Sequence, residues 1–142
     1  MTMIREENIR VQVLASDWKD AIRQAGELLV SAGSTARAYT EAMIAAIEEM
    51  GPYIVILPGL AIAHAASGEA VMKNDTALIT LREGVEFGSA NDPVNIILCL
   101  CCTDTKSHQD SLKQIAKKIL SATVLERIKN ACSVGEILDC LS

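Results

Sequence analysis

Two histidines are the side chains of this sequence best suited to take part in a reaction near neutral pH. His64 follows an apolar run, 60–63, and is followed by the small residues of 65–68. A neutral imidazole has a lone pair on one ring nitrogen, and the unperturbed pKa of histidine, about 6.5, leaves most of it neutral at pH 7. A histidine beside small residues at the end of a strand is accessible to a partner. This pattern is compatible with a nucleophile, but from these residues alone an ordinary histidine at a strand end is the simpler interpretation.

His108 is the second candidate, because it lies in the first turn of a helix that Ser107 is predicted to open. The free N–H groups and the dipole at a helix N-terminus favour negative charge and disfavour the imidazolium. A neutral His108 can therefore donate a hydrogen bond to an anion. His108 also lies four residues before Leu112 on the apolar face, so simple packing is the alternative.

The cysteines Cys99, Cys101 and Cys102 raise the question of a metal or thiol site. On a strand, Cys99 and Cys101 share one face and Cys102 points to the other, and this spacing is not a zinc pattern. We expect buried cysteines that act as small apolar residues, and no metal. A thiol or metal protein is the lowest-ranked function. Five cysteines without a framework spacing also favour a reducing cytosol.

The elements that must position the two histidines alternate between apolar strands and amphipathic helices. Apolar residues three and four apart predict helices over 18–32, capped by Ser16 or Asp17, and over 35–50, opened by Thr35. Pro58-Gly59 predicts a turn between two apolar runs. Strands are predicted over 8–14 (an edge strand with Ile9, Val11 and Val13 on one side), 53–57, 60–64, 75–81 and 93–102, with weaker candidates at 70–72 and 84–88. The central strands are expected to include 53–57, 76–81 and 94–101.

Three short helices are predicted at the end of the chain. Each has a possible capping box: Ser107 with Asp110, Thr123 with Glu126, and Ser133 with Glu136. Strands alternating with capped amphipathic helices, without a linker or repeat, predict one α/β domain over residues 1–142. Cys132 and Cys140 are both expected in helical surroundings.

Composition excludes several classes of function. Half of the 142 residues are hydrophobic but only 3% are aromatic, so the core must be aliphatic. The net charge is −5 and no basic stripe occurs, so nucleic acid is not an expected partner. The longest apolar stretch, 53–66, is interrupted by Pro58-Gly59 and is too short to span a bilayer. No signal peptide is recognisable. We expect a cytoplasmic protein without membrane insertion.

Several short motifs, taken in order, resemble the EIIA type-2 domain (mannitol/fructose type) of bacterial sugar phosphotransferase systems (PTS). The resemblance covers roughly the whole chain, and its first part is most similar to ascorbate-specific IIA components. The motifs are Pro52-Tyr53-Ile54-Val55, Pro58-Gly59, His64, Phe87-Gly88, Asn91-Asp92-Pro93 and Ser107-His108.

The resemblance implies a mixed parallel and antiparallel central sheet with helices on both faces, and no cofactor. It implies that His64 accepts phosphate through Nε2 from the phosphocarrier protein HPr, with Nδ1–H held by a backbone carbonyl. His64 then passes the phosphate to a cysteine of the cognate IIB component, which serves a membrane IIC permease. His108 would stabilise the phosphoryl group. The alternative is a regulatory domain of the same fold, whose phosphorylation controls a partner rather than sugar uptake.

Two positions depart from the family pattern. Ala63 stands where the family commonly has proline, and the helix before the active strand ends in Glu48-Glu49-Met50, without the arginine of the mannitol-like branch. A hydrogen bond from arginine to an anion contributes about 1.5–3 kcal/mol, more than the 0.3–1 kcal/mol typical of a helix terminus. We therefore expect backbone N–H groups of 65–68 to share in binding phosphate.

Overall fold

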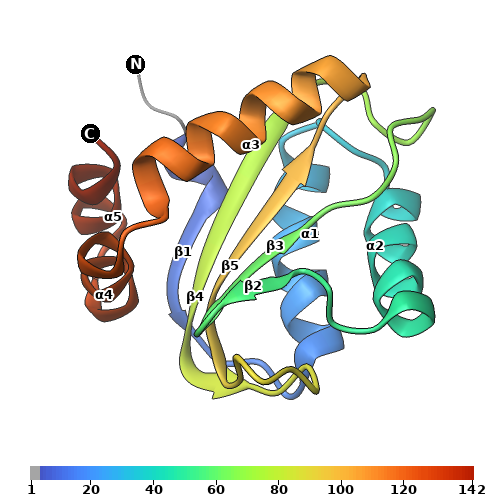
Figure 1. Ribbon diagram of the computed structural model, residues 1–142. Helices are drawn as coiled ribbons and strands as arrows, with labels where there is room; N and C mark the ends of the chain where they lie inside the picture. The colour runs from blue at the N-terminus through green and yellow to red at the C-terminus, as the bar shows by residue number, and fades with distance from the viewer. Residues whose placement is uncertain (1–3) are drawn as a thin grey trace.

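The backbone forms one mixed β-sheet with helices on both faces, seen in a computed structural model that describes residues 4–142 (Figure 1). The strand order is β1-β4-β5-β3-β2; β1 pairs with β4 and β3 with β5 in parallel, and the other two pairs are antiparallel. This architecture confirms the predicted fold class. The elements are a 3₁₀ turn at Glu6–Asn8, β1 (Ile9–Val13), α1 (Trp18–Ser31), α2 (Arg37–Met50), β2 (Val55–Leu57), β3 (Leu60–Ala63), β4 (Asp75–Val85), β5 (Val94–Cys101), α3 (Thr105–Ile119), α4 (Ala122–Asn130) and α5 (Val134–Leu141).

Each face of the sheet has its own aliphatic core. Helices α1 and α2 pack on one face, where they meet alternate residues of β3 and β5 such as Ala63 and Cys99. Helices α3, α4 and α5 pack on the other face against the intervening residues, such as Ile62 and Leu98. The alternation follows from the period of two along a strand. No helix within residues 4–142 is both long and apolar enough to cross a bilayer.

The strand predictions need three corrections. Segment 53–57 is not central, because β2 begins only at Val55 and pairs at the sheet edge with β3 alone. The Val55 N–H bonds to the Pro52 carbonyl in a turn, which leaves only three residues for the strand. Segments 75–81 and 84–88 are not separate, since one eleven-residue strand, β4, runs through Val85. Segment 70–72 makes only an isolated bridge between Thr35 and Val71.

Strand β1 lies at the opposite edge, as predicted, but its side chains do not all face one way. Ile9 and Val11 join the core beneath α3–α5, whereas Val13 packs against the core beneath α1 and α2. The cause is Gln12, which has a φ of 54° at an irregularity of the ladder and donates its N–H to Thr80 Oγ1 at 2.8 Å. An extra residue of this kind reverses the alternation of side chains.

The helix caps also differ in part from the prediction. Asp17 caps α1 and Ser133 caps α5, as expected. Helix α3 is capped by Asp104 and α4 by Ser121, so the predicted caps Ser107 and Thr123 lie inside these helices. An Asp or Ser located earlier in the chain can accept the same kind of N–H bond, and starting there adds intrahelical bonds. Helix α2 starts after Ala36, which provides no side-chain cap, rather than at Thr35.

Candidate functional site

His64 lies at the end of the sheet where the parallel strands β3 and β5 both finish. Its ring is partly buried, and Nδ1 lies 3.1 Å from the carbonyl oxygen of Ile62. A carbonyl oxygen can only accept a hydrogen bond, so a neutral ring in this position carries its proton on Nδ1. The lone pair is therefore on Nε2, the nitrogen available for attack. This is the tautomer that the family resemblance implies.

His108 is brought next to His64 by the fold, although it lies 44 positions later in the sequence. The ring centroids are 5.0 Å apart, with an angle of 48° between the ring planes. The contact arises because α3 begins just after β5, whose end lies beside the end of β3. Burial, and then the neighbouring His64, lower the pKa of His108. His108 is accordingly neutral at pH 7 and has one N–H to donate.

Tyr53 forms another wall of the site and was not singled out for this role in the sequence. Its ring stands edge-on to His64, with 5.9 Å between the ring centroids and an angle of 90° between the planes. The side chain is 42% exposed. Tyrosine is enriched at protein–protein interfaces relative to the rest of the protein surface, and this exposed ring is suited to such a contact. The only sequence signal was its place in the motif beginning at Pro52.

The loop after His64 has a different set of free donors from the one predicted. The Ala65 N–H donates to the hydroxyl of Tyr39 at 3.0 Å, so it cannot bind phosphate. Within residues 4–142, no hydrogen bond uses the N–H groups of Ala66, Ser67 or Gly68. These three residues are exposed and follow directly on the histidine.

The end of helix α2 carries carboxylates and no arginine. Glu48, near the position where the mannitol-like branch has arginine, forms an ion pair with Lys19 at 3.0 Å.

Asp104 caps α3, the helix that carries His108, and its carboxylate accepts the Ser107 N–H at 2.7 Å. That backbone bond lowers the pKa of Asp104, which is therefore charged at pH 7. Its role is to define the turn in which His108 lies.

Three cysteines are buried in or just after β5, as predicted. Cys99 Sγ lies 3.5 Å from Met43 Sδ, and Cys101 Sγ lies 3.4 Å from the Lys73 carbonyl oxygen. Burial raises the pKa of the Cys101 thiol to about 12, and it raises the pKa of the Cys99 thiol further, so neither is a thiolate at pH 7. Cys132, expected in helical surroundings, is exposed in the short connection between α4 and α5. Among residues 4–142, no three His, Cys, Asp or Glu side chains are grouped to hold a metal.

The motif Asn91-Asp92-Pro93 lies away from the histidines and organises the loop between β4 and β5. The Asp92 carboxylate accepts N–H bonds from Phe87, Gly88 and Ser89 at 2.8–3.1 Å. Asn91 joins this loop to the β2–β3 turn, because its carbonyl accepts the Gly59 N–H at 3.0 Å. Gly59 has a φ of 81°, a conformation that favours glycine. These contacts fix the position of the N-terminal end of β3.

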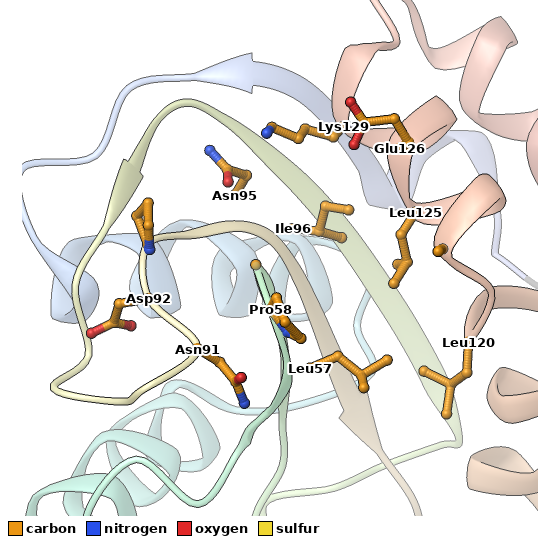
Figure 2. Close-up of a pocket in the computed structure, with 13 residues that line it drawn as sticks. Leu57, Pro58, Asn91, Asp92, Asn95, Ile96, Leu120, Leu125, Glu126 and Lys129 are labelled. Carbon is orange, nitrogen blue, oxygen red and sulfur yellow. The ribbon is translucent and has the colours of Figure 1, made fainter.

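A cavity of about 610 Å³ lies beside this loop, next to the turn that begins β3 (Figure 2). His64 follows the other end of that strand. Its wall combines the β2–β3 turn, the β4–β5 loop and helix α4, which are distant in the sequence. Apolar side chains such as Leu57, Ile96 and Leu125 form one side, and Asn95 and Lys129 extend toward the other. The cavity contains neither histidine nor cysteine, so the candidate site is the pair His64 and His108 and not this hollow.

Comparison with known proteins identifies the family. Residues 2–142 match the family model described as "Phosphoenolpyruvate-dependent sugar phosphotransferase system, EIIA 2". A relative from Shigella boydii serotype 4, named ascorbate-specific PTS system EIIA component, is 34% identical over 97% of this chain and 91% of its own length.

Two solved structures from Escherichia coli share the fold. The mannitol-specific cryptic phosphotransferase enzyme IIA has a TM-score of 0.89 at 26% identity, and the alignment covers 100% of this chain and 99% of the other. The mannitol enzyme IIA in a complex with phosphorylated enzyme IIB has a TM-score of 0.85 at 25% identity over 97% and 96% of the two chains. The chain therefore belongs to the EIIA type-2 family of the phosphoenolpyruvate-dependent sugar phosphotransferase system.

Proposed function

We propose that this protein carries phosphoryl groups on His64 Nε2 during the uptake of ascorbate. The observation that carries the proposal is the contact between His64 Nδ1 and the Ile62 carbonyl, which holds the proton on Nδ1 and leaves the Nε2 lone pair free. The phosphoryl donor is a phosphohistidine of HPr, and the phosphoryl acceptor is a cysteine of the cognate IIB component. All three proteins meet in the cytoplasm.

The transfer takes two successive nucleophilic displacements at phosphorus. In the first, the Nε2 lone pair attacks phosphorus, and the bond from phosphorus to the HPr nitrogen breaks with its electron pair returning to that nitrogen. In the second, a thiolate of IIB attacks phosphorus, and the Nε2–P bond breaks with its electron pair returning to His64. Such transfer asks the protein mainly for alignment and for stabilisation of charge on the phosphoryl oxygens.

His108 stabilises that charge. Its ring is 5.0 Å from the ring of His64, and its lowered pKa keeps it neutral with one N–H to donate. Ala66, Ser67 and Gly68 are exposed, and their N–H groups, which make no hydrogen bond within residues 4–142, supply further donors in the loop that follows His64. Together they take over the role that an arginine has in the mannitol-like branch.

Similar proteins support the choice of substrate and partner. The curated relatives are named ascorbate-specific, at 31–34% identity over 97% of this chain. The mannitol enzyme IIA was solved in a complex with phosphorylated enzyme IIB, which supports IIB as the acceptor here. These names favour transport over the regulatory alternative.

The experiment is transfer of labelled phosphate from phosphorylated HPr to the purified chain. The wild type is expected to gain one acid-labile, base-stable phosphate at His64, and His64→Ala is expected to gain none. Mass spectrometry under neutral conditions locates the group. Phosphate on His108, or phosphate still present after His64→Ala, contradicts the assignment. A deletion strain that still takes up ascorbate but has lost control of a partner supports the regulatory alternative.

A further inference from the structure

The hydroxyl of Tyr39 joins the ends of the two strands that lead to the candidate site. Tyr39 belongs to α2 and is only 3% exposed. Its hydroxyl accepts the Ala65 N–H at 3.0 Å and donates to the Leu100 carbonyl at 2.6 Å. Ala65 immediately follows His64, and Leu100 is next to the last residue of β5. One buried side chain of a helix thus contacts both strand ends.

The strand register shows what this hydroxyl replaces. The parallel β3–β5 ladder pairs Ala61 with Ile97 and ends at Ala63 with Cys99. In a parallel ladder every second residue of a strand bonds to the same neighbour. Gly59 bonds to β5 through its carbonyl, whereas Ile62 donates its N–H to the other side, toward Ile54. The next bond of the β3–β5 series would therefore run from the Ala65 N–H to the Leu100 carbonyl.

Tyr39 stands in that bond, because its hydroxyl lies between this donor and this acceptor. The hydroxyl therefore bridges β3 and β5 at the point where a direct backbone hydrogen bond would otherwise continue the ladder. His64 then has its backbone fixed on one side through Ala65 and its ring fixed through Ile62. Leu100 also lies just before the segment that caps α3, so the same hydroxyl sets the position of the helix carrying His108.

We propose that Tyr39 is a positioning residue, whose hydroxyl sets the orientation of the His64 ring and its separation from His108. The proposal rests on the proposed function only for its effect on phosphoryl transfer. The orientation of the ring is a property of the unphosphorylated protein. Burial raises the pKa of Tyr39, so the hydroxyl keeps its proton, and hence its bond to Leu100, throughout the range in which histidine titrates.

The test is Tyr39→Phe, which removes one oxygen atom and keeps the ring in the core. Two properties are measured: the ¹⁵N chemical shifts of His64, which report the tautomer, and the rate of phosphorylation by phosphorylated HPr. We expect the population with the proton on Nδ1 to fall and the rate to drop about two- to tenfold, the range given by the loss of one neutral hydrogen bond.

Two control variants separate positioning from a general loss of stability. Ile47→Val shortens another buried side chain of α2 and is expected to leave the His64 shifts unchanged. Thr35→Val removes a hydroxyl that is also buried but has no hydrogen-bond partner in the described part of the chain. If Tyr39→Phe does not fold, 3-fluorotyrosine incorporated at position 39 alone weakens the same acceptor and is expected to move the same shifts, while Tyr53, whose ring contacts His64, stays unchanged.

The outcomes distinguish this proposal from the proposed function. If the wild type accepts no phosphate while Tyr39→Phe still changes the His64 shifts, the carrier function is wrong and the positioning of His64 stands. If the wild type accepts phosphate, and if folded Tyr39→Phe has the same His64 shifts and the same phosphorylation rate as Ile47→Val, the positioning role is overturned. An unchanged set of shifts with 3-fluorotyrosine overturns it equally.

Discussion

Removal of the His108 side chain tests whether the second histidine stabilises the phosphoryl group. In His108→Ala the ring 5.0 Å from His64 is lost, together with the N–H that we expect to bond to a phosphoryl oxygen. His64 keeps its contact with the Ile62 carbonyl, so the nucleophile itself is intact. The variant should therefore accept phosphate at the same position but more slowly.

The exposure of the site sets the size of this effect. A hydrogen bond to a charged group contributes about 1.5–3 kcal/mol. His64 and His108 are both only partly buried, so water can replace part of the lost interaction. The lower part of the range, about 1.5–2 kcal/mol, is expected, and it corresponds to a rate about ten to thirty times slower.

The assay is a rapid-quench time course with phosphorylated HPr as donor. Gln109→Ala, which changes an exposed neighbour in the same helix, is the matched control and should keep the wild-type rate. His108→Gln retains an N–H donor and should recover part of the lost rate. The pH profile adds a further check, because the lowered pKa of His108 should place the midpoint of any rate change caused by His108 protonation below that of an ordinary histidine.

The reasoning fails if His108→Ala transfers phosphate as fast as Gln109→Ala does. It also fails if His108→Ala loses the reaction completely while remaining folded, because one lost hydrogen bond cannot account for that. Circular dichroism and thermal unfolding of each variant establish that the comparison is made between folded proteins.

Three further predictions concern the rest of the chain. Replacing all five cysteines by Ala or Ser, in a variant that circular dichroism shows to be folded, should preserve phosphorylation, and loss of labelling would indicate a catalytic thiol. Burial disfavours the Asp75 charge, but hydrogen bonds from Ser34 and its neighbours outweigh it, so the pKa of Asp75 is lowered. This stabilisation is present above the unfolded pKa of about 3.9 and is lost as the pH falls through the lower folded value. Asp75→Asn should therefore cost about 1–3 kcal/mol at pH 7 in urea unfolding and flatten the pH dependence below pH 4; equal slopes would refute this. Gly26→Ala should destabilise the α1–α2 packing by about 1–3 kcal/mol, because its Cβ would meet Thr40 Cγ2 at 2.7 Å, and Thr40→Ala should restore part of the loss.

The sequence alone was sufficient to predict the fold class and most of the elements. Apolar residues at intervals of three and four located α1 and α2, and the continuous apolar run from Val94 located β5. Pro58-Gly59 located the turn before β3, and the small residues 66–68 are exposed as expected, although the His64 ring itself is partly buried. These features are encoded locally, because side-chain periodicity and turn chemistry depend on neighbours in the chain.

Local patterns were ambiguous where two nearby residues offered the same interaction. Asp104 and Ser107 can each cap a helix, and only the course of the backbone after β5 selects Asp104. The apolar pattern of 53–57 is equally suited to a central strand and to an edge strand. Its place at the edge follows from its pairing with β3 alone, which depends on the whole sheet.

Tertiary structure alone decided how the site is assembled. The residue patterns suggested His64 and His108 separately, and only the family resemblance assigned them to one site, whereas the parallel pairing of β3 with β5 is what brings their rings to 5.0 Å. In the sequence, Tyr39 had no role beyond the apolar face of α2, since a hydroxyl has no effect on helical periodicity. The buried hydroxyl of Tyr39 bonds to Ala65 and Leu100, which are 26 and 61 residues away, and such long-range partners exist only after the sheet and helix have packed together.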